Sequence, residues 1–264
     1  MAGDNWLRFV QADFGGLFSN RSEAMHPNII ARSLALLALA CLQAALAAEP
    51  APLQPFQADY QVLRNGKELG QATLALRDAG NDAWEFSSQT RGTRGMASLL
   101  GVDVVEKSTF RWRGGLPEGL QYTYAQKAAI KSRQRSTDFD WNARQAHTRD
   151  GDSESTATLQ GSAMDRNLVT LALMARLKAG ATDLTFHVVD KDHVGEQRYV
   201  AGARESLSLP AGRIDAVRVD RQRDGGKRAT SIWFAPQRNW LPVQIEQVEK
   251  NGETVTMRLA AAAR

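Results

Sequence analysis

The sequence lacks the features that several protein classes require. Its 264 residues contain one cysteine, Cys41, which excludes a disulfide scaffold. It contains no Gly-x-Gly-x-x-Gly motif, phosphate-binding loop, His-Glu-x-x-His pair or serine nucleophile elbow. Its longest apolar run is shorter than the roughly 20 residues that cross a bilayer as a helix. No motif therefore assigns a reaction to this chain.

The composition is that of a globular protein, with 43% hydrophobic and 23% charged residues. Lysine and arginine number 33 against 29 acidic residues, which gives a net charge of +4. Acids and bases alternate along much of the chain, as at Arg204-Glu205 and Asp220-Arg221. Nucleic-acid binders usually cluster their basic residues on one face, so we expect no nucleic-acid partner.

The clearest local signal lies at residues 25–47. Arg32 precedes an apolar run over residues 33–42, and Ala45-Leu46-Ala47 is a small-x-small cleavage site. This layout predicts a signal peptide cleaved after Ala47, and therefore a periplasmic protein. The alternative is an uncleaved anchor, which the short apolar run disfavours. Lipid attachment at Cys41 is also disfavoured, because the residues after it stay apolar where a lipoprotein turns polar.

The remaining chain divides into three parts. Residues 1–24 precede Met25 and are interpreted as an upstream extension beyond the true start; the alternative is a cytoplasmic segment before a signal anchor. Residues 48–55 are a proline-rich lead, which is extended because proline disfavours helix. Residues 56–264 are predicted to form a single β-rich domain.

Alternation of apolar and polar residues predicts β-strands over most of this domain. Phe56, Ala58, Tyr60 and Val62 alternate with polar residues, and Asn65-Gly66 favours a type I′ hairpin. Short connections between such segments imply antiparallel neighbours. Further strands are predicted at 68–77, 83–90, 102–112, 120–127, 131–141, 183–189, 196–200, 205–209, 214–222, 229–234, 243–249 and 254–259.

One segment, Ser162 to Lys178, has apolar residues at helical spacing. Ser162 can cap this helix, and its wide apolar face places it deep against a sheet. The predicted fold class is therefore mainly β (α+β), a large curved antiparallel sheet or half-open β-barrel with one main covering helix at about 163–178.

Several short motifs resemble a known family. They are Phe56-Gln57-Ala58-Asp59-Tyr60 with Gly66 and Gly70, Met164-Asp165-Arg166-Asn167-Leu168, Trp233-Phe234-Ala235-Pro236, Trp240-Leu241-Pro242-Val243 and Asn251-Gly252. Across about residues 56–259 the chain resembles domain-of-unknown-function family 3108, which consists of exported bacterial proteins. Asn167 departs from the pattern, since a Ser-like residue is expected there.

The resemblance implies a fold similar in outline to periplasmic lipoprotein carriers, in which a half-open β-barrel wraps an apolar cavity closed by a helix. It provides no catalytic residues. An apolar segment, residues 95–101, lies between two glycines and can act as a lid over such a cavity. The candidate ligand-binding residues are Trp84, Phe86, Met96, Leu99, Leu100, Phe110, Trp112, Tyr122 and Tyr124. The alternative is that these side chains are ordinary sheet core.

Other candidate chemistry is sparse. His187, Asp190, Asp192 and His193 have metal-ligand residue types, but a polar turn between two strands explains them better, so we expect no metal and no cofactor. Asp103 and Glu106 could act as acid and base, although a solvated strand edge is the simpler interpretation.

A basic run also requires an interpretation. Lys127, Lys131, Arg133 and Arg135 could meet an anionic lipid or polysaccharide, or could protect an exposed edge strand from aggregation. Both interpretations stay open from the sequence.

Three functions fit these observations. The first is a non-enzymatic periplasmic carrier of an apolar or amphiphilic envelope molecule, with peripheral membrane contact compatible with that role. The second is an envelope assembly factor that binds another protein, and the third is a hydrolase of an envelope polymer. The sequence predicts neither the ligand nor the oligomeric state.

Overall fold

The computed structural model describes residues 51–129, 132–223 and 228–261. The chain divides into two units, residues 1–47 and 48–264, and all described residues belong to the second. The upstream extension and the signal peptide predicted from the sequence lie outside the described residues. The account that follows concerns the second unit alone.

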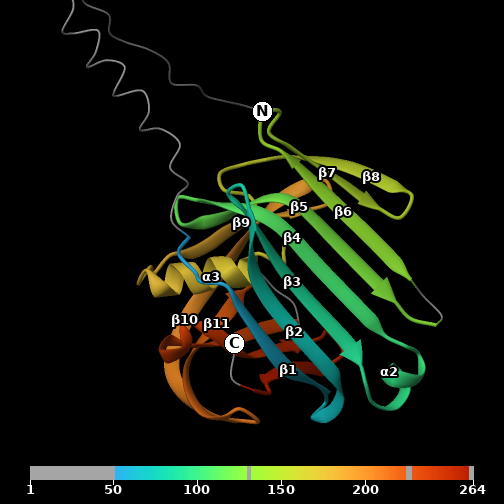
Figure 1. Ribbon diagram of the computed structural model, residues 1–264, viewed down its shortest axis with the longest axis vertical. Coiled ribbons are helices and arrows are strands. Elements are labelled where there is room, and N and C mark those ends of the chain that lie inside the picture. Colours follow the sequence, from blue (N-terminus) through green and yellow to red (C-terminus); the bar gives the residue numbers. More distant parts are fainter. Residues whose placement is uncertain (1–50, 130–131, 224–227, 262–264) are drawn as a thin grey trace, which may run out of the picture. The chain divides into compact units, whose positions relative to one another are not determined.

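A single antiparallel sheet of 14 strands forms most of the described chain (Figure 1). The first eight strands are β1 (Phe56–Arg64), β2 (Lys67–Gly80), β3 (Ala83–Gly92), β4 (Asp103–Arg113), β5 (Leu116–Lys127), β6 (Arg133–Asp140), β7 (Gln145–Asp150) and β8 (Ser153–Thr158). The last six are β9 (Leu184–Asp190), β10 (His193–Leu209), β11 (Gly212–Gln222), β12 (Ala229–Ala235), β13 (Leu241–Val248) and β14 (Thr254–Leu259).

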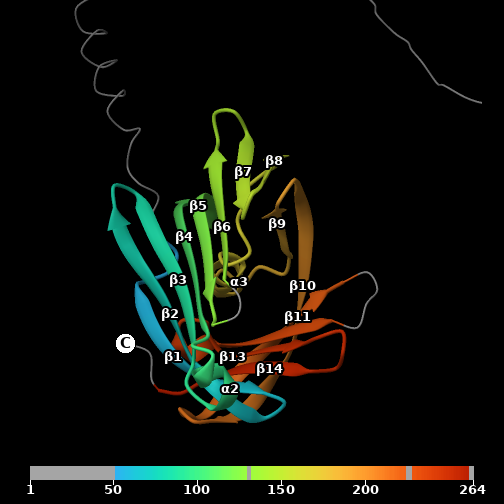
Figure 2. The same cartoon turned by 90° about the vertical axis from the view of Figure 1, so that its right-hand side faces the viewer.

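The strand order makes the sheet a nearly closed barrel. Consecutive strands pair with each other except β8 and β9, and β1 additionally pairs with β14. The two free edges are therefore β8 and β9, which are consecutive in the chain and are separated by the helix α3 (Val169–Lys178). Figure 2 shows the two halves of the sheet with α3 between them. The mainly β fold predicted from the sequence is confirmed.

Tight turns set the pairing of neighbouring strands. Asn65 and Gly66 both have positive φ, of 50° and 76°, as the type I′ hairpin between β1 and β2 requires. The predicted Asn251-Gly252 connection likewise joins β13 to β14, with Gly252 at a φ of 85°. Short turns of this kind fix an up-and-down sheet.

The helix α3 is shorter than the sequence pattern predicts. Met164 forms a parallel bridge with Val188 of β9, so the backbone before α3 is extended where a helix was expected. The predicted cap at Ser162 is therefore wrong. No side chain caps α3, whose N-cap position is Leu168, but the Asp165 carboxylate accepts hydrogen bonds from the backbone N–H groups of Asn167 and Leu168 in the turn before the helix.

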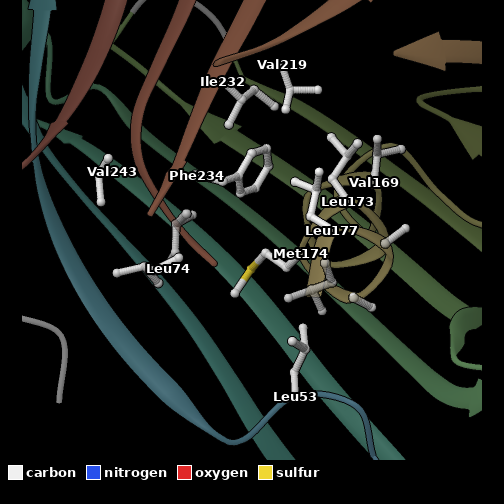
Figure 3. Packing of buried hydrophobic residues seen from close by; sticks show 14 of the residues in the cluster. Leu53, Leu74, Val169, Leu173, Met174, Leu177, Val219, Ile232, Phe234 and Val243 are labelled. Atoms are coloured by element: carbon white, nitrogen blue, oxygen red, sulfur yellow. The ribbon is translucent and has the colours of Figure 1, made fainter. Parts of the chain in front are cut away.

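The core lies between α3 and the concave face of the sheet (Figure 3). Seven of the ten residues of α3 are buried, so the helix is apolar nearly all round, as in a buried helix rather than a surface one. Met174 and Leu173 belong to this core together with Phe234 of β12 and Val243 of β13. Leu53 of the proline-rich lead is also buried in it, at 2% exposure.

Two edge-strand interpretations are wrong. The basic segment β6 is an interior strand paired on both sides, with β5 and β7. Arg133 and Arg135 there bind Asp150, while Lys131 lies outside the described residues. The strand β4, which carries Asp103 and Glu106, is also interior, between β3 and β5. Alternation in sequence identifies a strand but not its neighbours.

Two short helices complete the described chain, α2 (Gly95–Leu99) and η1 (Pro236–Arg238). The helix α2 occupies most of the segment predicted as a lid. Within residues 51–129, 132–223 and 228–261, no helix has the length and apolar character needed to traverse a membrane.

Candidate functional site

A cavity of about 790 Å³ opens between the two halves of the sheet. One wall, called here the N-terminal wall, consists of residues from β2 to β6. The C-terminal wall consists of residues from β9 to β14, including Arg221 and Arg223 at the end of β11 and Arg228 before β12. Residues 165–167, before α3, and Val169 and Thr170, at its start, also line it.

The cavity has an apolar portion on both walls. Because strand side chains alternate between faces, every second residue of these strands reaches the interior. Leu74 and Phe86 belong to the N-terminal wall and Val169 begins α3. The apolar residues of the C-terminal wall strands β12, β13 and β14 that line the cavity are Ile232, Ile245 and Met257.

The structure divides the predicted ligand-binding residues into two groups. Phe86, Tyr122 and Tyr124 line the cavity. The remaining aromatic residues pack in the core away from it: Phe110 and Trp112 meet edge to face at 5.1 Å between ring centroids, and Trp84 lies 6.4 Å from Trp112.

Two of the predicted lid residues, Leu99 and Leu100, do not line the cavity. Leu99 and Leu100 belong to or follow α2, and Leu99 is 79% exposed. The side chain of Met96 lies outside the described residues. The helix α2 contacts β2 and β3, beyond the cavity lining.

Asp165 is the most buried polar group of the cavity wall, at 2% exposure. Its Oδ1 atom accepts hydrogen bonds from the Ser108 hydroxyl (2.8 Å) and from the N–H groups of Asn167 (2.9 Å) and Leu168 (3.2 Å). Its Oδ2 atom is buried without a partner among the described residues. Burial raises the pKa of Asp165 to about 7, against the lowering effect of these three hydrogen bonds.

Arg166 joins the segment before α3 to the N-terminal wall. Its Nε atom donates to the Glu106 carboxylate and to the Tyr122 hydroxyl, each at 3.0 Å, and the guanidinium lies 4.9 Å from the Tyr124 ring centroid. The Tyr122 hydroxyl donates to Glu106 at 2.6 Å. Burial raises the pKa of Tyr122, and the Glu106 charge adds to that rise.

Ion pairs link the edges of the barrel near the seam between β8 and β9. Arg135 binds Asp150 of β7 at 2.9 Å and Asp190 of β9 at 3.5 Å. Lys191, which follows β9, also binds Asp150, at 3.5 Å. Asp150 is only 12% exposed, and hydrogen bonds from Arg133 and Arg135 hold its pKa well below the usual range.

The arginines of the C-terminal wall differ from these. Arg228 binds Glu249 at 2.5 Å, but in the described part of the chain no hydrogen bond or ion pair reaches the side chain of Arg221 or Arg223. The Nε atoms of both are buried without a partner. Burial lowers the pKa of Arg223, and the charges of Arg221 and Arg228 lower it further.

The cavity is therefore cationic on balance. Among the described residues its lining contains six basic side chains and three carboxylates. No group of three or more histidine, cysteine or acidic side chains in residues 51–129, 132–223 and 228–261 is arranged to hold a metal ion. His193, from the set with metal-ligand residue types, instead contacts its neighbour Asp192 at 3.2 Å.

Sequence reasoning missed the polar part of this site. Asp165 and Arg166 were noted only as parts of a family motif and a helix start. Arg221 was interpreted only as one of the mixed charges and Arg223 was not singled out, although both continue the inward face of β11 after the fully buried Val219. That alternation was the available signal.

Comparisons with known proteins agree with this architecture. The crystal structure of a beta-barrel-like protein of domain of unknown function DUF1849 from Brucella abortus is similar, with a TM-score of 0.50 and 12% identity. The match covers 80% of this chain and 98% of that chain, and at this identity the likeness concerns the fold alone. No curated protein matches the chain. The model of the protein family of unknown function DUF3108 matches residues 56–260, and the chain therefore belongs to that family.

Proposed function

We propose that this protein is a non-enzymatic periplasmic binding protein that carries an amphiphilic molecule of the cell envelope in the cavity of its barrel. The observation that carries the proposal is the cavity itself. Its volume of about 790 Å³ lies within the range of roughly 300–1,000 Å³ that is typical of small-molecule sites.

The chemistry of the lining supports an amphiphile rather than a purely apolar ligand. Apolar side chains such as Phe86, Ile232 and Met257 can contact an alkyl chain, because burial of apolar surface is favourable. Charged side chains line the same cavity, and burying a charge without a partner is costly. A ligand with a polar end and an apolar end satisfies both portions.

The polar groups of the N-terminal wall support a binding role over hydrolysis. The Oδ1 atom of Asp165 is occupied in the turn before α3. Glu106 is engaged by Arg166 and Tyr122. A general acid or base requires a free group within reach of the substrate, and among the described carboxylates of the lining the one fully buried oxygen without a partner is the Oδ2 atom of Asp165.

Native mass spectrometry of protein purified from the periplasm tests the proposal. The expected result is a bound mass in the range of a lipid or another amphiphile, released when the protein unfolds. Co-purification of another protein without a bound amphiphile would instead support the assembly-factor alternative.

Two substitutions on β4 provide a matched pair for that experiment. Val104 lines the cavity, whereas its neighbour Val105 is absent from the lining and points to the opposite face of the strand. Val104→Trp fills part of the cavity and is expected to abolish the bound mass. Val105→Trp is expected to retain it, and equal retention by both variants contradicts the proposal.

The periplasmic location has its own test. Intact-mass measurement of the protein from fractionated cells is expected to find it in the periplasm, lacking every residue up to Ala47. Recovery of an unprocessed chain from the cytosol would contradict the location without bearing on the cavity.

A further inference from the structure

We propose that the C-terminal wall of the cavity binds the anionic headgroup of the carried molecule through the guanidinium groups of Arg221 and Arg223, assisted by Arg228. This inference rests on the proposed function and specifies the class of ligand. That ligand is an alkyl chain ending in an oxyanion such as a phosphate, sulfate or carboxylate.

The pairing of the cavity cations carries the inference. Arg135, Arg166, Lys191 and Arg228 each have a carboxylate partner within 3.5 Å. Arg221 and Arg223 have none among the described residues, and the Nε atom of each is shielded from solvent. A buried donor without an acceptor costs free energy, and an oxyanion in the cavity supplies that acceptor.

Charge repulsion among the arginines of the C-terminal wall also favours a bound anion. Burial together with the charges of Arg221 and Arg228 depresses the pKa of Arg223. A guanidinium nevertheless remains protonated at physiological pH, so the folded protein cannot relieve the repulsion by losing a proton. An anion relieves it, and the planar fork of arginine matches the oxygens of phosphate and carboxylate groups.

The same wall provides the apolar contact for a chain attached to that anion. Ile232 of β12 and Ile245 of β13 are paired in register and both line the cavity. Met257 of β14 is the register partner of Ile245 and also lines it. An apolar row across three strands therefore lies on the wall that contains the unpaired arginines, so that one ligand can contact both.

The test compares ligands that share a tail or a headgroup. Isothermal titration of the purified chain uses dodecyl phosphate, the uncharged dodecyl maltoside and inorganic phosphate, the two amphiphiles below their micelle concentrations. The key variant is Arg221→Gln/Arg223→Gln. The matched control is Arg204→Gln/Arg213→Gln, which removes the same charge from exposed positions of β10 and β11 that do not line the cavity.

The wild type is expected to bind dodecyl phosphate about tenfold or more tightly than dodecyl maltoside. One charge-assisted hydrogen bond is sufficient for a tenfold difference in affinity. The key variant is expected to lose this preference, and the control to keep it. Arg223→Gln alone is expected to lose part of the preference, which provides a second reading if the double variant folds poorly.

The remaining outcomes distinguish the two proposals. Equal binding of both dodecyl compounds by wild type and key variant overturns the anion inference and leaves the carrier function standing. Tight binding of inorganic phosphate without a gain from the dodecyl chain identifies a free-anion site and overturns the amphiphile. If no dodecyl compound binds, and Val104→Trp changes nothing, both proposals fail.

Discussion

The charged side chains on the two sides of the cavity are paired differently. On the N-terminal wall Arg166, Glu106 and Tyr122 satisfy one another, and Arg135 is held by two aspartates. On the C-terminal wall Arg221 and Arg223 have no such partners among the described residues. Paired groups satisfy one another within the fold, whereas guanidinium groups whose buried Nε atoms have no acceptor are available to a ligand.

The first way to break this comparison is to remove the centre of the paired network. Asp165→Ala is expected to lower the free energy of unfolding by about 4 kcal/mol, because it removes the acceptor of two backbone N–H groups in the turn before α3 and of the buried Ser108 hydroxyl. Urea unfolding at pH 5.5, where Asp165 is protonated in the folded protein, measures this change in the free energy of unfolding.

The matched control for this variant is Asp78→Ala. Asp78 accepts a similar backbone bond, from the N–H of Gly80 at 2.8 Å, but in an exposed turn. Its loss is expected to cost about 0.5 kcal/mol. Equal losses for the two variants would contradict the central role of Asp165.

The next largest effect is expected on the pH dependence of the free energy of unfolding, through the titration of Asp165. The folded-state pKa of Asp165 is about 7, above its ordinary value near 4, so between these values the folded protein holds a proton that the unfolded chain has released. Stability from this group is therefore full below about pH 4 and falls as pH rises to about 7. The expected decrease between about pH 4.5 and 7.5 is about 3 kcal/mol.

Urea unfolding of wild type and Asp165→Asn across the same pH range measures this contribution. The stability difference between the two proteins is expected to shift in favour of the variant as pH rises, since the asparagine side chain does not titrate. A difference independent of pH would show that Asp165 has an ordinary pKa.

A smaller effect is expected from the ion pair of the N-terminal wall. A double-mutant cycle of Glu106→Gln and Arg166→Met is expected to give a coupling free energy of about 1 kcal/mol, because Glu106 is mostly buried while Arg166 is half exposed. The exposed pair of Arg149 and Glu154, at 2.8 Å, is the control and is expected to give about 0.3 kcal/mol. We expect a larger coupling free energy for the cavity pair than for the exposed pair. Equal coupling free energies would show that the cavity pair is no stronger than a surface ion pair.

The smallest effect is expected on the C-terminal wall. Arg223→Gln is expected to leave the free energy of unfolding unchanged or to raise it by about 0.5 kcal/mol, because it removes repulsion from Arg221 and Arg228. Arg213→Gln, at an exposed position, is the control for the loss of charge. A loss above about 1 kcal/mol in Arg223→Gln alone would reveal a stabilising partner and oppose the contrast between the walls.

The strands could be predicted from the sequence, because alternation and turn residues act locally. The start of α3 could not. Met164 lies in a sequence with helical spacing, but its pairing with Val188, a residue distant in the chain, holds the backbone extended. The predicted cap at Ser162 is therefore lost, and Asp165 instead holds the turn before α3.

The candidate site was predicted only in part. Phe86, Tyr122 and Tyr124 line the cavity, but Phe110 and Trp112 share the same apolar character and lie in the core. Residue type does not distinguish the two groups. The two groups differ in their position relative to α3, which fills part of the barrel. A local sequence pattern cannot predict that position.

Charge is where the sequence and the tertiary structure differ most. By itself the sequence determined a β-rich chain with closely mixed charges, because both properties depend on neighbouring residues. The folded strand separated those neighbours: Asp220 faces outward to Arg218 and Ser231, while Arg221 faces the cavity. Successive side chains on a strand point to opposite faces, so only closure of the sheet could leave cations inside without their sequence partners.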